Sequence, residues 1–519
     1  MEKSRTSYVI KNAWIGVLAQ SVALVLSFVS RTFFIKILGS DYLGVNGLFT
    51  DILTMLSIAE LGVGEAIVFN LYKPIAINDE KKIKTLVKFY KKAYQVIGIT
   101  IFLVGLCLIP FMDSIIPNKP NISENLILIY ILFLANTSIS YLYIYKSTIL
   151  KANQKNYITV IYKQVFHCIQ LVVQIILLYF THDYILYLII QFACTLIRNI
   201  MLSHKASKMY PYLNDKEESD ITKEERKEIF AHIKGTFVYK IGSSIINGTD
   251  SIIISKYIDI VSVGISSNYF LINTTIKKYL SQITSSFTAS LGNSNAIESN
   301  EKKENILYQV MYLCFIIYGY ASICLIVLSN DLINIWFGKE YLFGLSTVII
   351  IVLNIFFNGL RYPSYVYRST MGLFQHAKFI PILGAIINIV SSIILAKFIG
   401  IDGVYLGTIL AIMSTYFIAD PVIIYKHIFN KKPTKYFLTY FKYVILGAIV
   451  FIITYFITKN IIVTNFLMLI VKLIVTTIIS LSLLWLFTFK CDEYKKIKSV
   501  ALKRFKKLIN KFKGKKNGV

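Results

Sequence analysis

The chain has 519 residues, of which 55% are hydrophobic and only 16% are charged, and its formal net charge is +27. So little charge excludes an ordinary soluble domain of this size, whose surface needs more polar cover. The basic residues lie in short segments between long apolar runs, which is typical of a membrane protein and argues against nucleic-acid binding.

Apolar runs recur along the whole chain, and each is long enough to cross a ~30 Å hydrocarbon core as a helix. We predict an all-α integral membrane protein with about fourteen transmembrane helices. In chain order these are Ala13–Leu38, Leu43–Leu71, Ala93–Met112, Glu124–Thr148, Ile158–Phe180, Tyr184–His204, Ile233–Tyr257, Val263–Ala289, Ile306–Leu328, Ser346–Arg368, Phe379–Phe398, Val404–Tyr425, Phe437–Ile457 and Ile462–Phe487. The second and eighth are too polar to face lipid, so we expect them to line an interior.

The segments between the helices alternate in charge. The basic segments are 72–92, 205–234, 426–442 and the tail beyond residue 489. The segments that are poor in lysine and arginine are 113–123, 181–183 and 330–344. This alternation predicts that both termini are cytoplasmic. The tail has one apolar helical face among its lysines, which is typical of a helix on anionic lipid or of a partner-binding segment.

Two halves of the chain resemble each other at an offset of about 220 residues. A polar stripe on the first predicted helix has the same spacing as one on the seventh. The two stripes are Gln20, Ser27 and Arg31, and Lys240, Asn247 and Ser251. We therefore predict two pseudo-symmetric six-helix lobes, a helix pair and a tail. Their boundaries are 1–213 and 214–430 for the lobes, 431–489 for the last two helices, and 490–519 for a basic amphipathic cytoplasmic tail.

Charged side chains inside the predicted helices suggest a site. A charge at the bilayer centre costs ~3 kcal/mol or more, so such residues normally face a cavity or pair with one another. Cations outnumber anions, which predicts a cationic central cavity. The candidate substrate-binding residues are Arg31, Lys240, Lys277 and Arg361, with the polar residues Gln20, Asn247 and Asn358. Cations nearer the helix ends, such as Lys146 and Arg198, could instead extend to the headgroups.

The acidic residues inside the helices have two interpretations. Glu65, Asp250 and Asp51 are either ion-coupling carboxylates or salt-bridge partners of the cations. Asp420, beside Pro421, could simply position a helix end. The sequence has no nucleophile motif, no phosphate-cradling glycine loop and no histidine pair at metal spacing. We therefore expect a transporter without a cofactor or a metal, and no enzyme.

Several motifs resemble those of a known family. They are Ser30–Gly39 (SRTFFIKILG), Tyr42–Phe49 (YLGVNGLF), Ala59–Ala66 (AELGVGEA), Leu71–Pro74 (LYKP) and Asp79–Ile83 (DEKKI). They are similar to the start of the polysaccharide-transporter (Wzx-type) flippases of the multidrug/oligosaccharidyl-lipid/polysaccharide (MOP) superfamily, whose members have MATE-like six-helix lobes. The resemblance implies transport of an undecaprenyl-diphosphate-linked oligosaccharide for capsule or another surface polysaccharide, across a bacterial plasma membrane. Arg31 falls where the family carries a cation in its first helix.

Other functions remain open at this point. A lipid II or teichoic-precursor flippase would differ in the headgroup and not in mechanism. A multidrug cation antiporter would need an anionic cavity. A membrane-embedded polymerase or glycosyltransferase would be expected to have a large extracytoplasmic loop or an acidic metal motif. The expected partners are the lipid-linked oligosaccharide and membrane lipids, with a polymerase and glycosyltransferases as neighbours. The prenyl tail should stay in lipid or in a groove of the last two helices.

Overall fold

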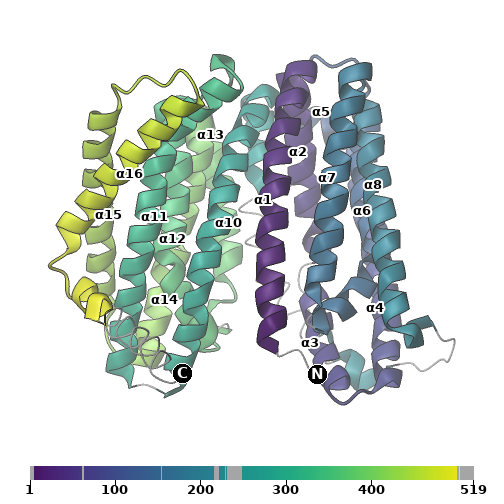
Figure 1. Cartoon of the computed structure of the whole chain (residues 1–519), viewed down its shortest axis with the longest axis horizontal. Coiled ribbons are helices and arrows are strands. Elements are labelled where there is room, and N and C mark those ends of the chain that lie inside the picture. Colours follow the sequence, from purple (N-terminus) through teal and green to yellow (C-terminus); the bar gives the residue numbers. More distant parts are fainter. Residues whose placement is uncertain are drawn as a thin grey trace, which may run out of the picture. The chain divides into compact units, whose positions relative to one another are not determined.

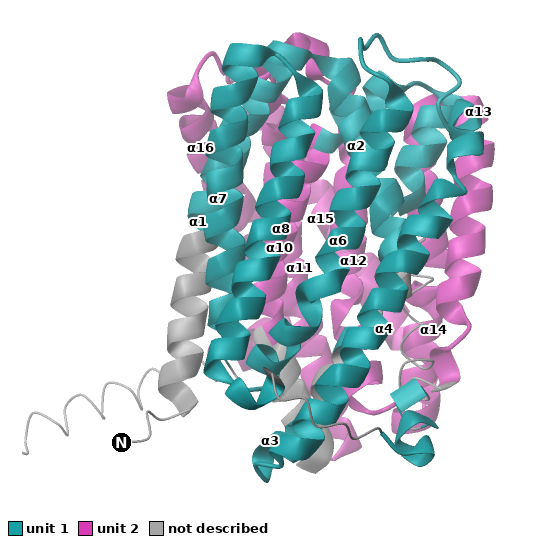
Figure 2. Cartoon of the chain, turned by 90° about the vertical axis from the view of Figure 1, so that its right-hand side faces the viewer, with its two compact units in different colours: residues 1–267 teal, residues 268–519 magenta. Residues whose placement is uncertain are grey.

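The computed structural model describes residues 5–60, 63–153, 155–214, 221–227, 229–230, 248–297, 299–373, 375–499 and 502, and gives only the backbone for some helical stretches, among them 5–20, 65–69 and 286–297. All regular elements in these ranges are helical (Figure 1). By their packing the helices form two compact units, residues 1–267 and 268–519 (Figure 2).

Unit 1 contains α1 (Arg5–Leu38), α2 (Ser40–Leu56), η1 (Ser57–Glu60), α3 (Val63–Ala76), α4 (Glu80–Leu106), η2 (Ile109–Phe111), α5 (Met112–Ile115), α6 (Leu126–Ala152), α7 (Asn156–Thr181), α8 (Tyr184–Met209), η3 (Pro211–Asn214), a helix over 248–257 and the start of α10 (Ile260–Ile297). In this unit α1 packs along α7, α4 packs on α6, and α6 packs on α8.

Unit 2 contains the rest of α10, α11 (Asn300–Trp336), η4 (Lys339–Tyr341), α12 (Leu345–Thr370), η5 (Gln375–Ala377), α13 (Ile380–Ser414), α14 (Tyr416–Ile424), η6 (Tyr425–Phe429), α15 (Thr434–Thr458) and α16 (Phe466–Thr488). The helix α11 is central, because α12, α15 and α16 all pack against it.

The helices confirm the predicted class of fold. Within the described residues, 10 stretches are long and apolar enough to cross a membrane. One of them, Ile380–Phe429, has 50 residues and corresponds to two predicted helices. The second and eighth predicted helices, which we expected to be too polar for lipid, are not among the 10, and most of the seventh lies outside the described residues.

A helical hairpin within α13 explains why this stretch corresponds to two predicted helices. Gly400 has φ +60°, a left-handed backbone conformation that glycine adopts without strain, and the chain reverses there. The two arms pack so closely that a Cβ at Gly407 would lie 2.3 Å from Ser392 Oγ. Asn388 donates to Thr408 Oγ1 across the arms at 2.9 Å, which satisfies both buried polar groups.

Two predicted segments differ in the structure. The second predicted helix is broken: α2 ends at Leu56, η1 follows, and α3 begins at Val63. The Gly62 and Gly64 of this stretch weaken a continuous helix. The basic segment 72–92 is largely helical, because α4 begins at Glu80. Asp79 caps α4 by accepting from Lys82 N at 2.9 Å, and lysine is a good helix former, so α4 extends beyond its apolar run.

The starting residues of the helices reflect the internal repeat. The helices α2 and α10 begin at residues 40 and 260, α4 and α11 at 80 and 300, and α6 and α12 at 126 and 345. The separations are therefore 220, 220 and 219 residues, close to the predicted offset. The predicted domain boundaries at 213, 430 and 489 concern the repeat rather than packing, and they stay predictions.

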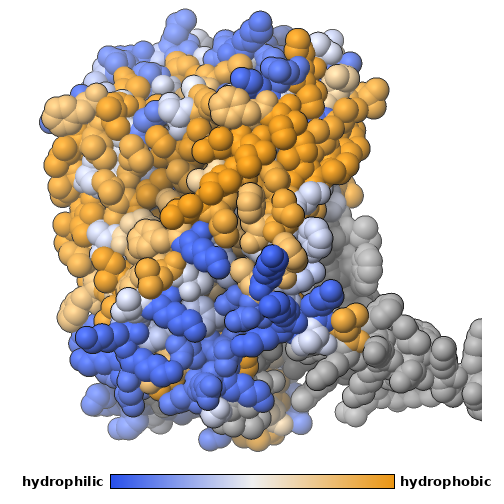
Figure 3. Space-filling view, turned by 90° about the vertical axis from the view of Figure 1, so that its left-hand side faces the viewer, coloured by the Kyte–Doolittle hydropathy of each residue, from blue (hydrophilic) through white to orange (hydrophobic). Residues whose placement is uncertain are grey.

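Apolar side chains lie on the outside of most long helices. The most apolar windows of α1, α4, α6, α7, α8, α13, α15 and α16 are only 17–28% buried, whereas that of α11 is 78% buried. On the face that carries α15 and α16, an apolar band separates two hydrophilic ends (Figure 3). An exposed apolar band of this kind is stable in lipid and not in water, so the chain is a multi-pass membrane protein.

The helix α16 turns a narrow polar stripe inward. Lys472, Thr476, Ser480 and Thr488 are buried, while Leu467 and Ile478 are exposed on other faces. Lys472 Nζ forms an ion pair with Asp331 Oδ2 of α11 at 2.7 Å. The stripe therefore faces α11, and most of the other side chains of α16 are apolar.

Candidate functional site

Some of the predicted site residues cannot be placed. Lys240 and Asn247 lie outside the described residues. Gln20 and Glu65 belong to α1 and α3, but their side chains are also outside the described part. The remaining candidates fall into two groups, one in each unit: Arg31, Asp51 and Asp250 in unit 1, and Lys277, Asn358 and Arg361 in unit 2.

Arg31 lies on α1 and is half-buried. Its Nη2 donates to Ser267 Oγ, near the start of α10, and the guanidinium lies close to Tyr184 and Tyr187 of α8. The two tyrosine rings are stacked, with centroids 5.9 Å apart, and Phe34 contacts both edge-on. The planar guanidinium is therefore held by a hydroxyl and beside aromatic rings, surroundings in which its remaining donors can bind an anion.

A glycine contact brings α10 close enough for Ser267 to reach Arg31. A Cβ at Gly44 would lie 2.1 Å from the carbonyl oxygen of Ile260, and a Cβ at Gly264 would lie 2.9 Å from Gly44 N. Only glycine permits this approach of two backbones. One turn further on, Ser267 also donates its hydroxyl to Gly264 O at 2.6 Å. Gly44 and Gly264, which are 220 residues apart as the offset of the repeat requires, thus touch each other.

The two acidic candidates of unit 1 that can be described lie on neighbouring helices. Asp51 of α2 accepts a hydrogen bond from the hydroxyl of Ser251, which belongs to the helix over 248–257. Ser251 is 6% exposed and Asp250 beside it is 8% exposed. The carboxylate of Asp51 is therefore satisfied at least in part by a neutral donor.

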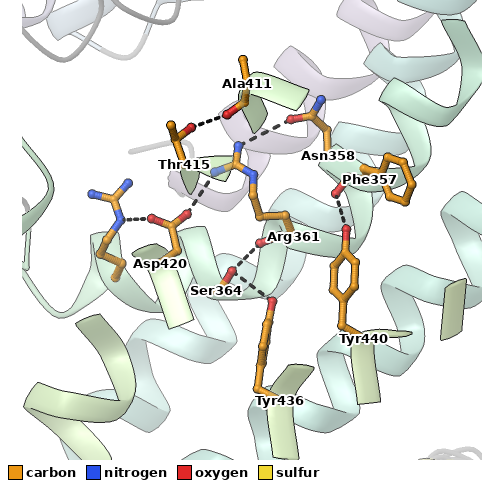
Figure 4. Close-up of polar contacts among 10 residues, drawn as sticks. Phe357, Asn358, Arg361, Ser364, Ala411, Thr415, Asp420, Tyr436 and Tyr440 are labelled. Carbon is orange, nitrogen blue, oxygen red and sulfur yellow. Dashed lines mark hydrogen bonds and ion pairs between the residues drawn. The ribbon is translucent and has the colours of Figure 1, made fainter. Parts of the chain in front are cut away.

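In unit 2, Arg361 belongs to a buried ion cluster (Figure 4). Arg361 Nη1 is 3.0 Å from Asp420 Oδ2, and Arg368 Nε is 2.7 Å from Asp420 Oδ1. The side chains of Asp420 and Arg368 are 0% and 1% exposed, and that of Arg361 is 16% exposed. Because Arg361 and Arg368 are seven residues apart, they lie on one face of α12 and meet Asp420 of α14 together. Two cations thus share one carboxylate.

The surroundings of Arg361 hold it in place. Its guanidinium lies over the Tyr416 ring, 4.8 Å from the centroid, and its Nη2 is 3.5 Å from Asn358 Oδ1. Its carbonyl oxygen accepts from Ser364 Oγ at 2.8 Å, and Ser364 accepts in turn from Tyr436 of α15. The predicted pair Arg361 and Asn358 is therefore brought together.

Lys277 lies on an exposed polar face of α10. Thr274, Ser281 and Ser285 lie on the same helical face and are also exposed. The positive charge of Arg361 acts on Lys277, so the two cations are neighbours. The salt bridges between described residues do not include Lys277. The cluster of Lys277, Arg361, Arg368 and Asp420 therefore carries an excess of positive charge.

Sequence reasoning missed the central member of this cluster. The interpretation of Asp420 as a residue that merely positions a helix end was wrong, because it is a buried counter-ion for two arginines. Arg368 was not among the candidate site residues, and the carboxylate that it shares with Arg361 was not predicted. A signal was present in the sequence, because a carboxylate in an apolar stretch, such as Asp420, needs a positively charged partner. Arg361, which lies 59 residues before it, is that partner.

The fold is that of the transporters of the MOP superfamily. The chain is similar to a solved structure of the lipid II flippase MurJ in an inward closed conformation, with 16% identity over 91% of this chain and 98% of that one, and a TM-score of 0.65. An inward-facing multidrug resistance MATE family transporter of the MOP superfamily has 13% identity, covers 78% of this chain and 96% of its own, and has a TM-score of 0.61.

A third similar structure is a MOP superfamily transporter from Pyrococcus furiosus that is described as having a binding pocket of reverse polarity. It has 13% identity, covers 80% of this chain and 93% of its own, and has a TM-score of 0.52. No family model matches the sequence. No curated protein matches it either. At these identities the comparisons establish the fold, and the Wzx-type resemblance of the sequence remains a hypothesis.

Proposed function

We propose that the chain is a flippase that moves undecaprenyl-diphosphate-linked oligosaccharide repeat units across a bacterial plasma membrane, for capsular or other surface polysaccharide. The observation that carries this proposal is the excess positive charge around Arg361. Arg361 and Arg368 share the carboxylate of Asp420, and Lys277 adds a third cation. Net charge within a membrane is costly unless an opposite charge offsets it, and a lipid diphosphate carries that charge.

Arg31 is the corresponding group in unit 1. An arginine offers a planar fork of donors that fits phosphate oxygens, and the hydroxyl of Ser267 holds this fork on one side. The sequence-based candidates Gln20, Lys240 and Asn247 complete the proposed set. A ligand shifts a conformational equilibrium only through differential contacts, and an anionic substrate that binds these cations more tightly in one conformation than in another would do so. This is the basis for an alternating-access cycle.

The carboxylates of unit 1 serve as ion-coupling groups or as internal partners in this proposal. Asp51 accepts from Ser251, and its own negative charge is not offset by that neutral hydroxyl. Asp51, Asp250 and Glu65 are the candidates for a coupling cation. Both termini are cytoplasmic in the proposed orientation, by the positive-inside distribution of lysine and arginine.

The prenyl chain of the substrate is proposed to lie along the last two helices. Their outer surfaces are apolar, with Leu438, Ile445 and Leu467 at least 60% exposed (Figure 3). Lys472 does not disturb this surface, because it points inward to Asp331. No chemical conversion is part of the proposal, and the similar solved structures are transporters and flippases.

A lipid II flippase is the second candidate, and the likeness to MurJ over 91% of the chain favours it. Its substrate would use the same cations, since it too carries a diphosphate. Reconstitution of the full chain into liposomes separates the two. Fluorescent undecaprenyl-diphosphate-linked oligosaccharide or lipid II is placed in the inner leaflet, and its arrival outside is measured with an impermeant quencher.

We expect the linked oligosaccharide to cross at least tenfold faster than in liposomes without protein. Faster transfer of lipid II alone would establish the second candidate instead. Transfer of neither lipid, with proton-driven efflux of a cationic dye, would overturn both. Lys36→Ala is the matched control for cavity variants, because Lys36 is an exposed cation near the end of α1 and outside the candidate site.

A further inference from the structure

Two pockets of unit 1 adjoin each other along α6 and α8, since Tyr143 lines the first and Leu142 the second, and α4 also lines the second; we call the two pockets together the groove. These helices pack side by side, α4 on α6 and α6 on α8 (Figures 1 and 2). The first pocket has a volume of about 650 Å³ and lies between the carboxyl-terminal ends of α6 and α8. The second has a volume of about 280 Å³ and lies between all three helices. None of the candidate site residues lines either pocket.

The first pocket is basic and rich in hydrogen-bond donors. Lys146 of α6 and His204, Ser207 and Lys208 of α8 line it. Lys146 Nζ donates to Ser207 Oγ at 2.5 Å, so the ammonium group is held across the pocket and does not extend away from it. The charge of Lys91 on α4 acts on Lys146. Within the described residues, the salt bridges do not involve Lys91, Lys146 or Lys208.

Helix ends alone do not explain these lysines. The last turn of a helix favours a cation, and Lys208 in the last turn of α8 has this benefit. Lys146 precedes the end of α6 by six residues, and Lys91 lies within α4, so neither has it. Like charges that approach each other without a carboxylate are stabilised by a bound anion.

The second pocket is apolar and continues the same groove. Ile139 of α6 lines it, together with Gly98 and Leu103 of α4 and Phe192 of α8. Ile139 and Lys146 share one face of α6, seven residues and therefore about 10 Å apart along the axis. Gly98 and Lys91 share one face of α4 with the same spacing. The apolar pocket thus lies one headgroup length further from the basic end.

We propose that this groove binds an anionic glycerophospholipid of the cytoplasmic leaflet, with its phosphate in the basic pocket and an acyl chain along the apolar pocket. The positive charge of the basic pocket favours a phosphate. The distance between the basic pocket and the apolar pocket matches the distance between the phosphate and the acyl chains of a phospholipid. Ile99, Leu103, Ile200 and Met201 around the groove are 45–57% exposed, so acyl chains reach it from the bilayer. The lysine-rich start of α4 places the basic end at the cytoplasmic surface. The inference does not depend on transport.

Native mass spectrometry of the full chain in detergent tests the proposal, with dioleoyl phosphatidylglycerol as the probe and dioleoyl phosphatidylcholine as the neutral control. We expect Lys146→Ala/Lys208→Ala to weaken phosphatidylglycerol binding at least tenfold, since two charge-assisted contacts are lost. Lys151→Ala/Lys205→Ala is the matched control. It removes two exposed lysines from the same helices outside the pocket, and binding should stay within twofold of the unchanged protein.

Further variants separate headgroup from chain and binding from folding. Lys146→Arg/Lys208→Arg keeps the charge and should keep the binding. Ile139→Trp fills the apolar pocket, so it should weaken dioleoyl but not dihexanoyl phosphatidylglycerol, whose chains are too short to fill that pocket. Equal loss in the control pair, or unchanged binding in Lys146→Ala/Lys208→Ala, would overturn the proposal. Tighter, lysine-dependent binding of undecaprenyl diphosphate would assign the groove to the transport substrate and overturn it as well.

Discussion

Arg31 in unit 1 and Arg361 in unit 2 are both arginines on apolar helices, yet their described contacts differ in kind. Arg31 is held by the hydroxyl of Ser267 and by tyrosine rings, all of which are neutral. Arg361 shares a fully buried carboxylate with Arg368. Arg31 can turn from its neutral partner to a ligand with the loss of one hydrogen bond. Arg361 would have to break a buried ion pair to do the same, so we expect it to stabilise the fold as well as to supply positive charge.

The largest effect is expected from Asp420→Asn. It leaves Arg361 and Arg368 without their shared negative charge, and breaking a buried pair in this way costs roughly 3–5 kcal/mol. Thermal unfolding in detergent measures the loss. Asp492→Asn at an exposed position is the control. Arg361→Ala should destabilise less, because Arg368 still pairs with Asp420. Equal stability of Asp420→Asn and the unchanged protein would refute the counter-ion role.

Arg31→Ala should lower transport at least tenfold while folding remains nearly intact, if one charge-assisted contact of ~1.5–3 kcal/mol with the diphosphate is lost. Arg31→Lys keeps the charge without the bidentate fork, so its transport rate should lie between those of Arg31→Ala and the unchanged protein. Lys36→Ala should transport normally. The measurement is the liposome transfer assay, at matched protein content. Normal transfer by Arg31→Ala would mean that Arg31 does not contact the substrate.

The glycine contact tests how Ser267 is positioned at Arg31. Gly44→Ala places a methyl group against the backbone of Ile260, which cannot move aside as a side chain can, so we expect destabilisation of roughly 1–3 kcal/mol. Gly47→Ala, one turn along α2, meets Val263 at an ordinary 3.5 Å and should be tolerated or slightly stabilising. Thermal unfolding compares the two. The same melting temperature for both variants would show that α2 and α10 can separate without loss.

The smallest effect concerns a salt bridge outside the membrane. Lys82 at the start of α4 pairs with Glu225, and this hydrogen bond lowers the pKa of Glu225 below its ordinary value of 4.5. A lowered carboxyl pKa contributes stability that is present above the ordinary value and is lost as the pH falls through the folded value. Both side chains are about one-third exposed, so the pair contributes at most about 1 kcal/mol.

Limited proteolysis near residue 225 measures this contact at pH 7 and pH 3. Glu225→Gln should be cleaved slightly faster than the unchanged protein at pH 7 and equally fast at pH 3. Asp492→Asn again serves as a control. A difference that grows toward pH 3 would have the wrong sign for this pair.

The sequence was sufficient for the fold because membrane helices are defined by length and apolar composition, which are local properties. The end of the first run at Leu38 and the start of the sixth at Tyr184 were predicted in this way and match α1 and α8, whereas α1 begins at Arg5 and α8 ends at Met209, beyond the predicted bounds. The break after Leu56 was not predicted, because the apolar run continues to Leu71 and hides the local helix-weakening signal of Gly62 and Gly64.

The candidate site was predictable only in part, because contacts between distant segments leave no trace in periodicity. The candidates Arg361 and Asn358 are three residues apart and so share one helical face, and their side chains are 3.5 Å apart in the structure. Their counter-ion Asp420 is on another helix, and a single sequence does not show which helix faces which. The partner of Lys472 was missed on the same ground, because Asp331 lies 141 residues away.

Lipid chains are as apolar as leucine, so an apolar helix in a bilayer gains little from choosing one rotation about its own axis over another. The inward stripe of α16 changes this. Turning α16 by half a revolution would expose Lys472 to hydrocarbon and leave Asp331 without its partner. The free energy of the leucine and isoleucine side chains would change little, because lipid and protein interior are similarly apolar. The ion pair of Lys472 and Asp331, together with the hydrogen bonds between Tyr312 and Thr488 and between Tyr320 and Thr477, therefore sets the rotation of α16 about its axis, and its apolar residues are free to vary as long as they remain apolar.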